Sequence, residues 1–254
     1  MKKPVSLLFH KINPFFLLLI LPAFAAGQVD FFPCEKQNQD LKKLFTGDTL
    51  HYLYVHSCSG VGMEGLSSSF LLPTGNPPQT GFDDDDQEIE AMGKYEIWSC
   101  RYAAGNLGDK DPATAWVEGV DGQGIGEVIM VPCLDFDKTV YIWTGYGKSE
   151  NLFYANSRPK KIRLCIIRGQ DPGITQYGIV WEELVVISEN EADLEDMNFY
   201  QEIVVPEFKV DSFYFTPFDQ VIPYEYFLGL EILEVYPGSK YEDTCISEIT
   251  SMDK

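Results

Sequence analysis

The chain has 254 residues, with 39 acidic against 19 lysine and arginine side chains and a formal net charge of −20. A chain this acidic repels nucleic acid and anionic membrane surfaces, so the composition excludes nucleic-acid binding. Neutral glycans, cations and basic proteins remain as partners. The length accommodates one large all-β domain with an extension, or two small domains.

The N-terminus has the pattern of an export signal. Lysines precede the apolar run Pro14–Ala26, and small residues at its end permit cleavage after Ala25 or Gly27. The run is shorter than the ~18–20 apolar residues that a spanning helix needs. An uncleaved anchor is the alternative. We predict a signal peptide over residues 1–27, a secreted or periplasmic mature protein, and no integral membrane association.

The cysteine content fits export. An exported chain with six cysteines forms up to three disulfides, and we expect at least one. Cys165 lies within the strand-like segment IRLCII, which makes it a candidate for a free buried thiol. The six are Cys34, Cys58, Cys100, Cys133, Cys165 and Cys245.

The chain is rich in short, β-favouring segments separated by Gly, Pro, Asn or Asp, a pattern typical of an all-β sandwich. Only Asn38–Phe45 predicts a helical turn or two. The expected strands are Thr49–His56, Ser68–Leu72, Lys94–Trp98, Glu127–Pro132, Thr139–Thr144, Lys161–Arg168, Val180–Ile187, Tyr200–Val205, Val210–Phe215 and Tyr226–Val235.

Two acidic stretches interrupt these strands. Pro73–Glu90 is rich in turn residues and contains Asp83–Asp86, so it predicts a solvated linker, with cation binding by the four aspartates as the alternative. Glu189–Asn198 predicts a surface insertion between strands. We therefore expect an N-terminal extension over residues 28–73, an acidic linker over 74–93 and a main domain over 94–254.

The segment NLGDKDPATAWVEGVDGQGIGE, which begins at Asn106, has the oxygen ligands of a cation site. Asp109, Asp111 and Thr114 follow one another at i, i+2 and i+5, and near the C-terminus Glu248 offers a closing carboxylate. Oxygen ligands alone suit Ca²⁺. An Asx turn, in which Asp109 caps its own backbone, is the alternative. An ion pair between Lys110 and Glu248 is another.

Three ordered segments also carry a family resemblance: TAWVEGVDGQGIGE, GYGKSENLFYANSRPKKIRL and VYPGSKYEDTCISEI. They resemble the NADase-type glycan-binding domain, a branch of the discoidin-like (galactose-binding-like) β-sandwiches. The resemblance covers roughly residues 94–249 and implies a discoidin-like jelly-roll sandwich, here preceded by a β extension. It departs from the family where GYGKS lacks an Asn before Gly-Tyr and in the acidic stretch Glu189–Asn198.

The resemblance implies a structural Ca²⁺ beside the loop that begins the domain. Its ligands would be the main-chain oxygen of Asn106, the Asp109 carboxylate, the Asp111 main-chain oxygen, both oxygens of Thr114, and Glu248. Such an ion would position loops and would take no part in catalysis.

The same segments contain a set of aromatic and polar residues suited to sugar, which needs an aromatic face and hydrogen-bonding groups. For three of these residues a structural role is the alternative to sugar binding. Trp116 would then lie in the core, and Arg158 and Glu118 would pair with each other or with Asp243. Tyr146 and Tyr236 are the better stacking candidates. The set is Trp116, Glu118, Tyr146, Lys148, Asn156, Arg158, Tyr236, Lys240, Tyr241 and Asp243.

The sequence contains no G-x-S-x-G or H-E-x-x-H motif. A carboxylate pair such as Glu118 and Glu127 is the remaining hydrolase candidate. We therefore predict a non-catalytic, exported carbohydrate-binding module that recognises a glycan or glycosylated surface through loops at one end of the sandwich. A protein-interaction or adhesion module is the alternative, and a glycoside hydrolase is a third.

Overall fold

The computed structural model describes residues 37–56, 58, 65–175, 178–211, 213–215 and 221–253. The predicted signal peptide and Cys34 lie outside the described residues. No helix among the described residues is long and apolar enough to cross a bilayer.

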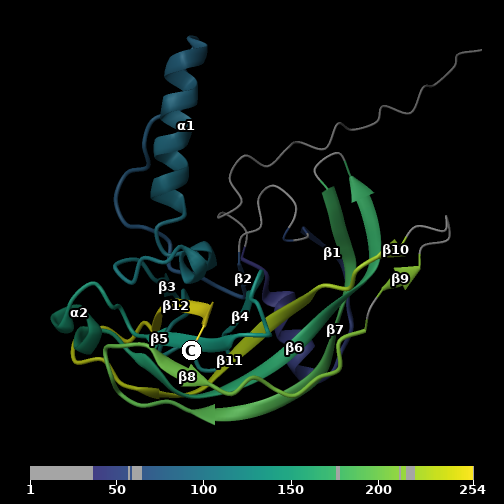
Figure 1. Ribbon diagram of the computed structural model, residues 1–254. Coiled ribbons are helices and arrows are strands. Elements are labelled where there is room, and N and C mark those ends of the chain that lie inside the picture. Colours follow the sequence, from purple (N-terminus) through teal and green to yellow (C-terminus); the bar gives the residue numbers. More distant parts are fainter. Residues whose placement is uncertain are drawn as a thin grey trace, which may run out of the picture. The chain divides into compact units, whose positions relative to one another are not determined.

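Two antiparallel sheets form the body of the described chain (Figure 1). One has six strands in the order β1-β7-β6-β11-β4-β2, and the other has four in the order β3-β12-β5-β8. The first sheet consists of β1 (Leu50–His56), β2 (Leu66–Ser67), β4 (Val128–Val131), β6 (Arg158–Thr175), β7 (Gly178–Asp193) and β11 (Tyr226–Tyr236). The second consists of β3 (Trp116–Val117), β5 (Thr139–Thr144), β8 (Gln201–Ile203) and β12 (Cys245–Met252).

Alternating apolar side chains form the core between the sheets. In β5, Val140 and Ile142 are buried while their neighbours in sequence are only half-buried, as the period of two in a strand requires. They pack in one cluster with Leu164 of β6, Leu230 of β11 and Ile246 of β12. The predicted all-β, discoidin-like sandwich is confirmed.

A second apolar cluster is centred on the short helix η2 (Gln39–Thr46). Leu41 and Leu44 of this 3₁₀ helix pack with Trp181, Leu184 and Phe227 from the six-stranded sheet. The helix ends at Gly47, whose φ of 87° is left-handed and favours glycine. The predicted helical turns at Asn38–Phe45 are confirmed.

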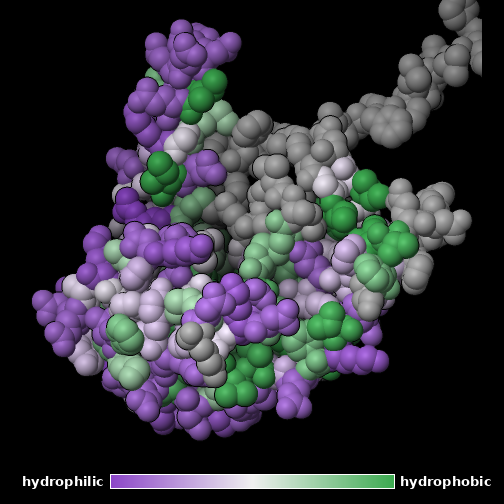
Figure 2. Space-filling view, viewed as in Figure 1, coloured by the Kyte–Doolittle hydropathy of each residue, from purple (hydrophilic) through white to green (hydrophobic). Residues whose placement is uncertain are grey.

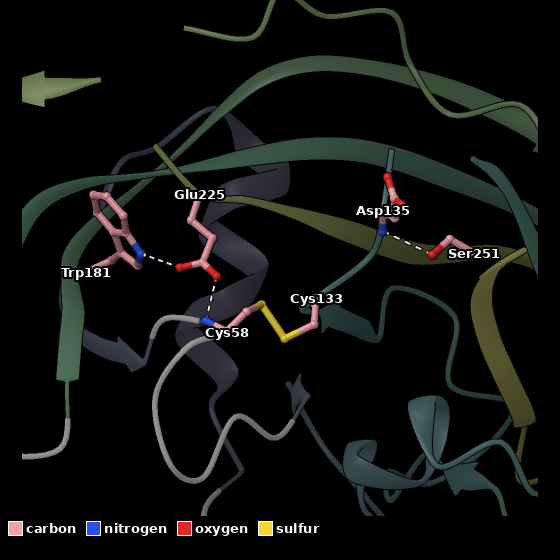
Figure 3. The surroundings of a disulfide bond; sticks show 6 residues. All are labelled: Cys58, Cys133, Asp135, Trp181, Glu225 and Ser251. Carbon is pink, nitrogen blue, oxygen red and sulfur yellow. Dashed lines mark hydrogen bonds between the residues drawn. A yellow bond between two sulfur atoms is a disulfide. The ribbon is translucent and has the colours of Figure 1, made fainter. Parts of the chain in front are cut away.

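Residues of the expected extension belong to the same sheet as the main domain. Strand β1 pairs with β7, and β2 pairs with β4. A disulfide joins Cys58 to Cys133, across 75 positions of sequence (Figure 3). Beside it the Glu225 carboxylate accepts hydrogen bonds from the Cys58 backbone N–H at 2.6 Å and from Trp181 Nε1 at 2.9 Å.

For the cysteines that the structure describes, the predictions are confirmed. At least one disulfide is present, and Cys165 is a free, buried thiol. Cys245 is a second buried free thiol.

The acidic linker and the strand predicted at Lys94–Trp98 contain a helix instead. Helix α1 (Asp85–Ser99) begins where the Asp84 carboxylate accepts a hydrogen bond from the Gln87 N–H at 3.0 Å. Acidic residues in its first turn stabilise the helix through their favourable interaction with the positive end of the helix dipole. The strand prediction was wrong because the β-favouring residues Tyr95–Trp98 follow a helix start that we read as a charge run.

The acidic stretch Glu189–Asn198 is a surface insertion only in its second half. Strand β7 continues to Asp193, which pairs with Lys161 of β6. The two strands form one long hairpin, so the predicted strands Lys161–Arg168 and Val180–Ile187 were too short. Backbone pairing with β6 extends β7 beyond its apolar residues, which is why composition alone misplaced the end.

The remaining elements are short. They are the 3₁₀ helix η3 (Ala104–Gly108), the helix α2 (Glu150–Ala155), and the strand pair β9 (Tyr214–Phe215) and β10 (Val221–Ile222). Residues 68–72, predicted as a strand, do not form one, and β2 ends just before them.

Candidate functional site

The loop that follows η3 meets strand β12 at Glu248. The backbone N–H of Lys110 donates a 2.8 Å hydrogen bond to Glu248 Oε1, across 138 positions of sequence. Lys110 adopts φ of 65°, a left-handed conformation that few residues other than glycine take. Among the described ion pairs none joins the Lys110 ammonium to Glu248. Lys110 therefore contacts the Glu248 carboxylate through its backbone N–H and not through its side chain.

Asp109 organises the loop. Its two carboxylate oxygens accept hydrogen bonds from the Asp111 N–H at 2.8 Å and from Thr114 Oγ1 at 2.7 Å. Thr114 Oγ1 also lies 2.9 Å from the Asp111 carbonyl oxygen. The Asn106 side chain donates to the carbonyl oxygens of Arg101 and Ala115, both at 2.9 Å. The Asx turn anticipated as an alternative is therefore present.

Glu248 is a buried carboxyl group with an unfilled acceptor. Its side chain is fully buried, and Oε2 has no hydrogen-bond partner among the described residues. The pKa of Glu248 is raised to about 8, chiefly by burial and in addition by the nearby Asp109 carboxylate. A cation at this point would offset both effects.

The residues around Glu248 fit Ca²⁺ only if main-chain carbonyl and hydroxyl oxygens serve as ligands together with the carboxylates. Within the described part of the chain, no three His, Cys, Asp or Glu side chains gather as a metal site. The available set is the orphaned Glu248 Oε2, the Asp109 carboxylate, Thr114 and neighbouring carbonyl oxygens. This donor set is the hard, oxygen-only type that Ca²⁺ prefers.

Trp116 and Glu118 lie inside the protein rather than at a binding surface. Trp116 is fully buried, and its Nε1 donates to the Ser69 carbonyl oxygen at 2.9 Å. Glu118 is also fully buried and accepts hydrogen bonds from the N–H groups of Val120 at 2.9 Å and Thr244 at 3.2 Å. Burial raises the pKa of Glu118 to about 7. Both residues have structural positions.

Arg158 is buried and saturated by internal contacts. Its guanidinium makes two 2.8 Å hydrogen bonds to the Asp196 carboxylate and a third, of 2.7 Å, to the Asn156 carbonyl oxygen. The guanidinium carbon also lies 5.1 Å from the Phe153 ring centroid and 6.0 Å from that of Tyr236. The structural alternative for Arg158 holds, but its partner is Asp196 of the acidic stretch rather than Glu118 or Asp243.

A cavity of about 330 Å³ brings together part of the predicted binding set. Tyr146, Asn156, Tyr241 and Asp243 line it, and Tyr102 adds a third tyrosine. Sequence reasoning missed Tyr102, which precedes the conspicuous loop and belongs to none of the three segments. We call this space the tyrosine cavity. Its other lining residues are Leu71, Leu72, Thr74, Val117 and Leu152.

The other predicted binding residues lie outside the tyrosine cavity. Lys148 is exposed, and the Tyr236 hydroxyl donates to the Leu194 carbonyl oxygen at 3.0 Å. Lys240 lies beside the cavity, with Nζ 4.7 Å from the centroid of the Tyr241 ring.

The two carboxylates of the candidate hydrolase pair have internal partners. Glu127 is buried, forms an ion pair with Lys42 of η2, and accepts a 2.5 Å hydrogen bond from Ser68 Oγ. Neither Glu118 nor Glu127 lines the cavities described. Their contacts explain both carboxylates as structural.

Comparison with known proteins adds the family. Residues 86–252 match the family described as the NAD glycohydrolase translocation F5/8 type C domain. No curated protein matches the chain. The match covers more than half of the sequence and includes both the Glu248 contact and most of the tyrosine cavity. The chain therefore belongs to the NAD glycohydrolase translocation F5/8 type C domain family, a family of discoidin-like β-sandwiches.

Proposed function

We propose that this protein is an exported, non-catalytic binding module that recognises carbohydrate in the tyrosine cavity. The observation that carries the proposal is the composition of the cavity wall: three tyrosines with the Asn156 amide and the Asp243 carboxylate. Tyrosine rings pack against the apolar face of a sugar, and amide and carboxylate groups bind its hydroxyls. Tyr241, which is 41% exposed, is open to such stacking.

A structural Ca²⁺ is part of the proposal. It would be held by the main-chain oxygens of Asn106 and Asp111, the oxygens of Thr114, and the carboxylates of Asp109 and Glu248. The buried, orphaned Glu248 Oε2 supports this assignment. The ion would fix the loop that leads into β3, whose Val117 lines the cavity.

Export is supported by the basic, apolar N-terminus and by the Cys58–Cys133 disulfide. Disulfides persist in oxidising compartments such as the periplasm and the extracellular space.

A glycan array probed with the mature protein tests carbohydrate binding. We expect hits that Tyr241→Ala abolishes and that Tyr154→Ala retains. Tyr154 is a matched control because it is 44% exposed and does not line the cavity. Arg158→Ala is unsuitable, since removing that buried side chain disturbs the fold. An array without hits for the calcium-loaded protein would contradict the proposal.

A protein-interaction role is the second candidate. The family's description refers to translocation rather than to sugar. Apolar side chains gather beside β9 and β10 (Figure 2), where Ile174, Phe213 and Val221 are between 51% and 63% exposed. If this surface carries the function, Ile174→Ser with Phe213→Ser should abolish binding to the partner while Tyr241→Ala leaves it unchanged.

A further inference from the structure

We infer that the tyrosine cavity selects an amino sugar, a carbohydrate that carries a free, protonated amine. The inference rests on the proposed carbohydrate function and names the ligand class of the same site. It follows from the charge and the aromatic character of the groups around the cavity.

Asp243 brings an uncompensated negative charge to the cavity wall. The residue is half-buried, and none of the described ion pairs includes it. Asp196 and Glu127 have such partners in Arg158 and Lys42. The buried Glu118 and Glu248 have none among the described ion pairs, but neither of them lines the cavity. A carboxylate left in this state favours a ligand that supplies the missing cation.

The tyrosine rings favour the same ligand charge. An aromatic ring presents a negative face, and an ammonium group within about 6 Å of its centroid is attracted to it. The protein already shows this contact at the cavity, where Lys240 Nζ lies 4.7 Å from the centroid of the Tyr241 ring. Lys240 is exposed, so its side chain is free to leave the ring when a ligand amine arrives.

Negative charge disfavours the opposite class of sugars. A sialic acid, a uronic acid or a sulfated glycan would place an anion against Asp243, on a protein whose net charge is −20. N-acetylated and neutral sugars would leave the Asp243 carboxylate without a cation. The amino sugar alone among these classes satisfies both the carboxylate and the rings.

The test compares two series of oligosaccharides of equal length, one of glucosamine and one of N-acetylglucosamine. Calorimetric titration of the mature protein at mildly acidic pH, where the sugar amine is protonated, should give tighter binding to the glucosamine series. The difference should be about tenfold or more, as expected for a charge-assisted hydrogen bond. Binding should weaken as the pH rises and the amine loses its proton.

Two variants separate this contact from a general effect of charge or folding. Asp243→Asn should weaken glucosamine binding about tenfold, whereas Asp137→Asn, which removes an exposed charge outside the cavity, should not. Lys240→Gln should strengthen glucosamine binding severalfold, because it removes the competing cation from Tyr241. A purely structural role for Lys240 predicts no such gain.

Equal affinity for both series, unchanged in Asp243→Asn, would overturn the amino-sugar inference and leave carbohydrate binding intact. Absence of binding to any carbohydrate would overturn both. Binding of a lysine-rich peptide that depends on Asp243, without binding of glucosamine oligomers, would assign the cavity to a protein partner and would also overturn the inference.

Discussion

Arg158 and Asp196 are joined by two parallel 2.8 Å hydrogen bonds across 38 positions of sequence. The pair ties the start of β6 to the segment that follows β7. Arg158 is almost fully buried, with 5% of its side chain exposed, so its positive charge depends on this partner. The pair therefore has the geometry of a structural contact, and its loss has a measurable cost.

Removing Asp196 should destabilise the fold. In Asp196→Ala the guanidinium remains buried without its carboxylate, and we expect the free energy of unfolding to fall by about 2 kcal/mol. Denaturant unfolding measures the change. Glu234→Gln is the control, because it breaks the solvent-exposed pair with Lys160 and should leave stability almost unchanged. Equal effects of the two variants would contradict the structural role of Asp196.

Calcium should stabilise the protein through Glu248. At a calcium concentration about 100 times the Kd, binding adds about 2.7 kcal/mol to the free energy of unfolding, so a chelator should lower the melting temperature. Glu248→Gln should remove the difference between calcium and chelator. The exposed Glu242→Gln should keep it. If neither calcium nor the chelator changes the melting temperature of the wild-type protein, the protein does not bind a structural Ca²⁺ at this site.

Glu118 should make stability depend on pH. Its pKa in the folded protein is about 7, above its usual value of 4.5, chiefly because of burial. Between these two values the unfolded chain releases a proton that the folded protein retains. The free energy of unfolding should therefore fall as the pH rises from 4.5 to about 7.

Glu118→Gln tests this slope. The variant cannot ionise, so its stability relative to the wild type should increase from pH 5 to pH 8. It should be less stable than the wild type at pH 5, because the amide NH₂ cannot accept the hydrogen bond that Glu118 accepts from Val120 or Thr244. A constant difference between variant and wild type across this range would refute the assignment.

The Cys58–Cys133 disulfide should hold strand β1 in the sheet. The two cysteines are 75 positions apart, and closing a loop of that length stabilises a fold by about 4 kcal/mol in the chain-entropy account. The double variant Cys58→Ala, Cys133→Ala should lose stability of this order. Hydrogen exchange should accelerate more in the β1–β7 pairing than in the β5–β12 pairing, and uniform acceleration would argue against a local role.

The sequence predicted the structure best where apolar and polar residues alternate along a strand, or where a segment resembles a known family. The expected strand Thr139–Thr144 coincides with β5, where Val140 and Ile142 alternate with half-buried neighbours and face the core. The meeting of Glu248 with the loop around Asp109 was also anticipated, through the family resemblance. Both rest on patterns that are local or shared by a family.

Sequence reasoning failed where a distant partner decides the structure. Nothing near Arg158 identifies Asp196 as its counterion, because an acidic stretch offers many equivalent carboxylates. For helix α1 a local signal did exist. Asp84 precedes Gln87 by three residues, the spacing of a helix cap, but the run of aspartates concealed it.

Leu71 and Leu72 of the extension and Thr74, the first residue of the linker, also line the tyrosine cavity. The family match begins only at residue 86, so a truncated fragment that starts there would lack these lining residues, as well as the helix that shields Trp181 and Leu184. Such a fragment should aggregate through its uncovered sheet. A negative sugar-binding result obtained with it would reflect the missing lining residues rather than the intact protein.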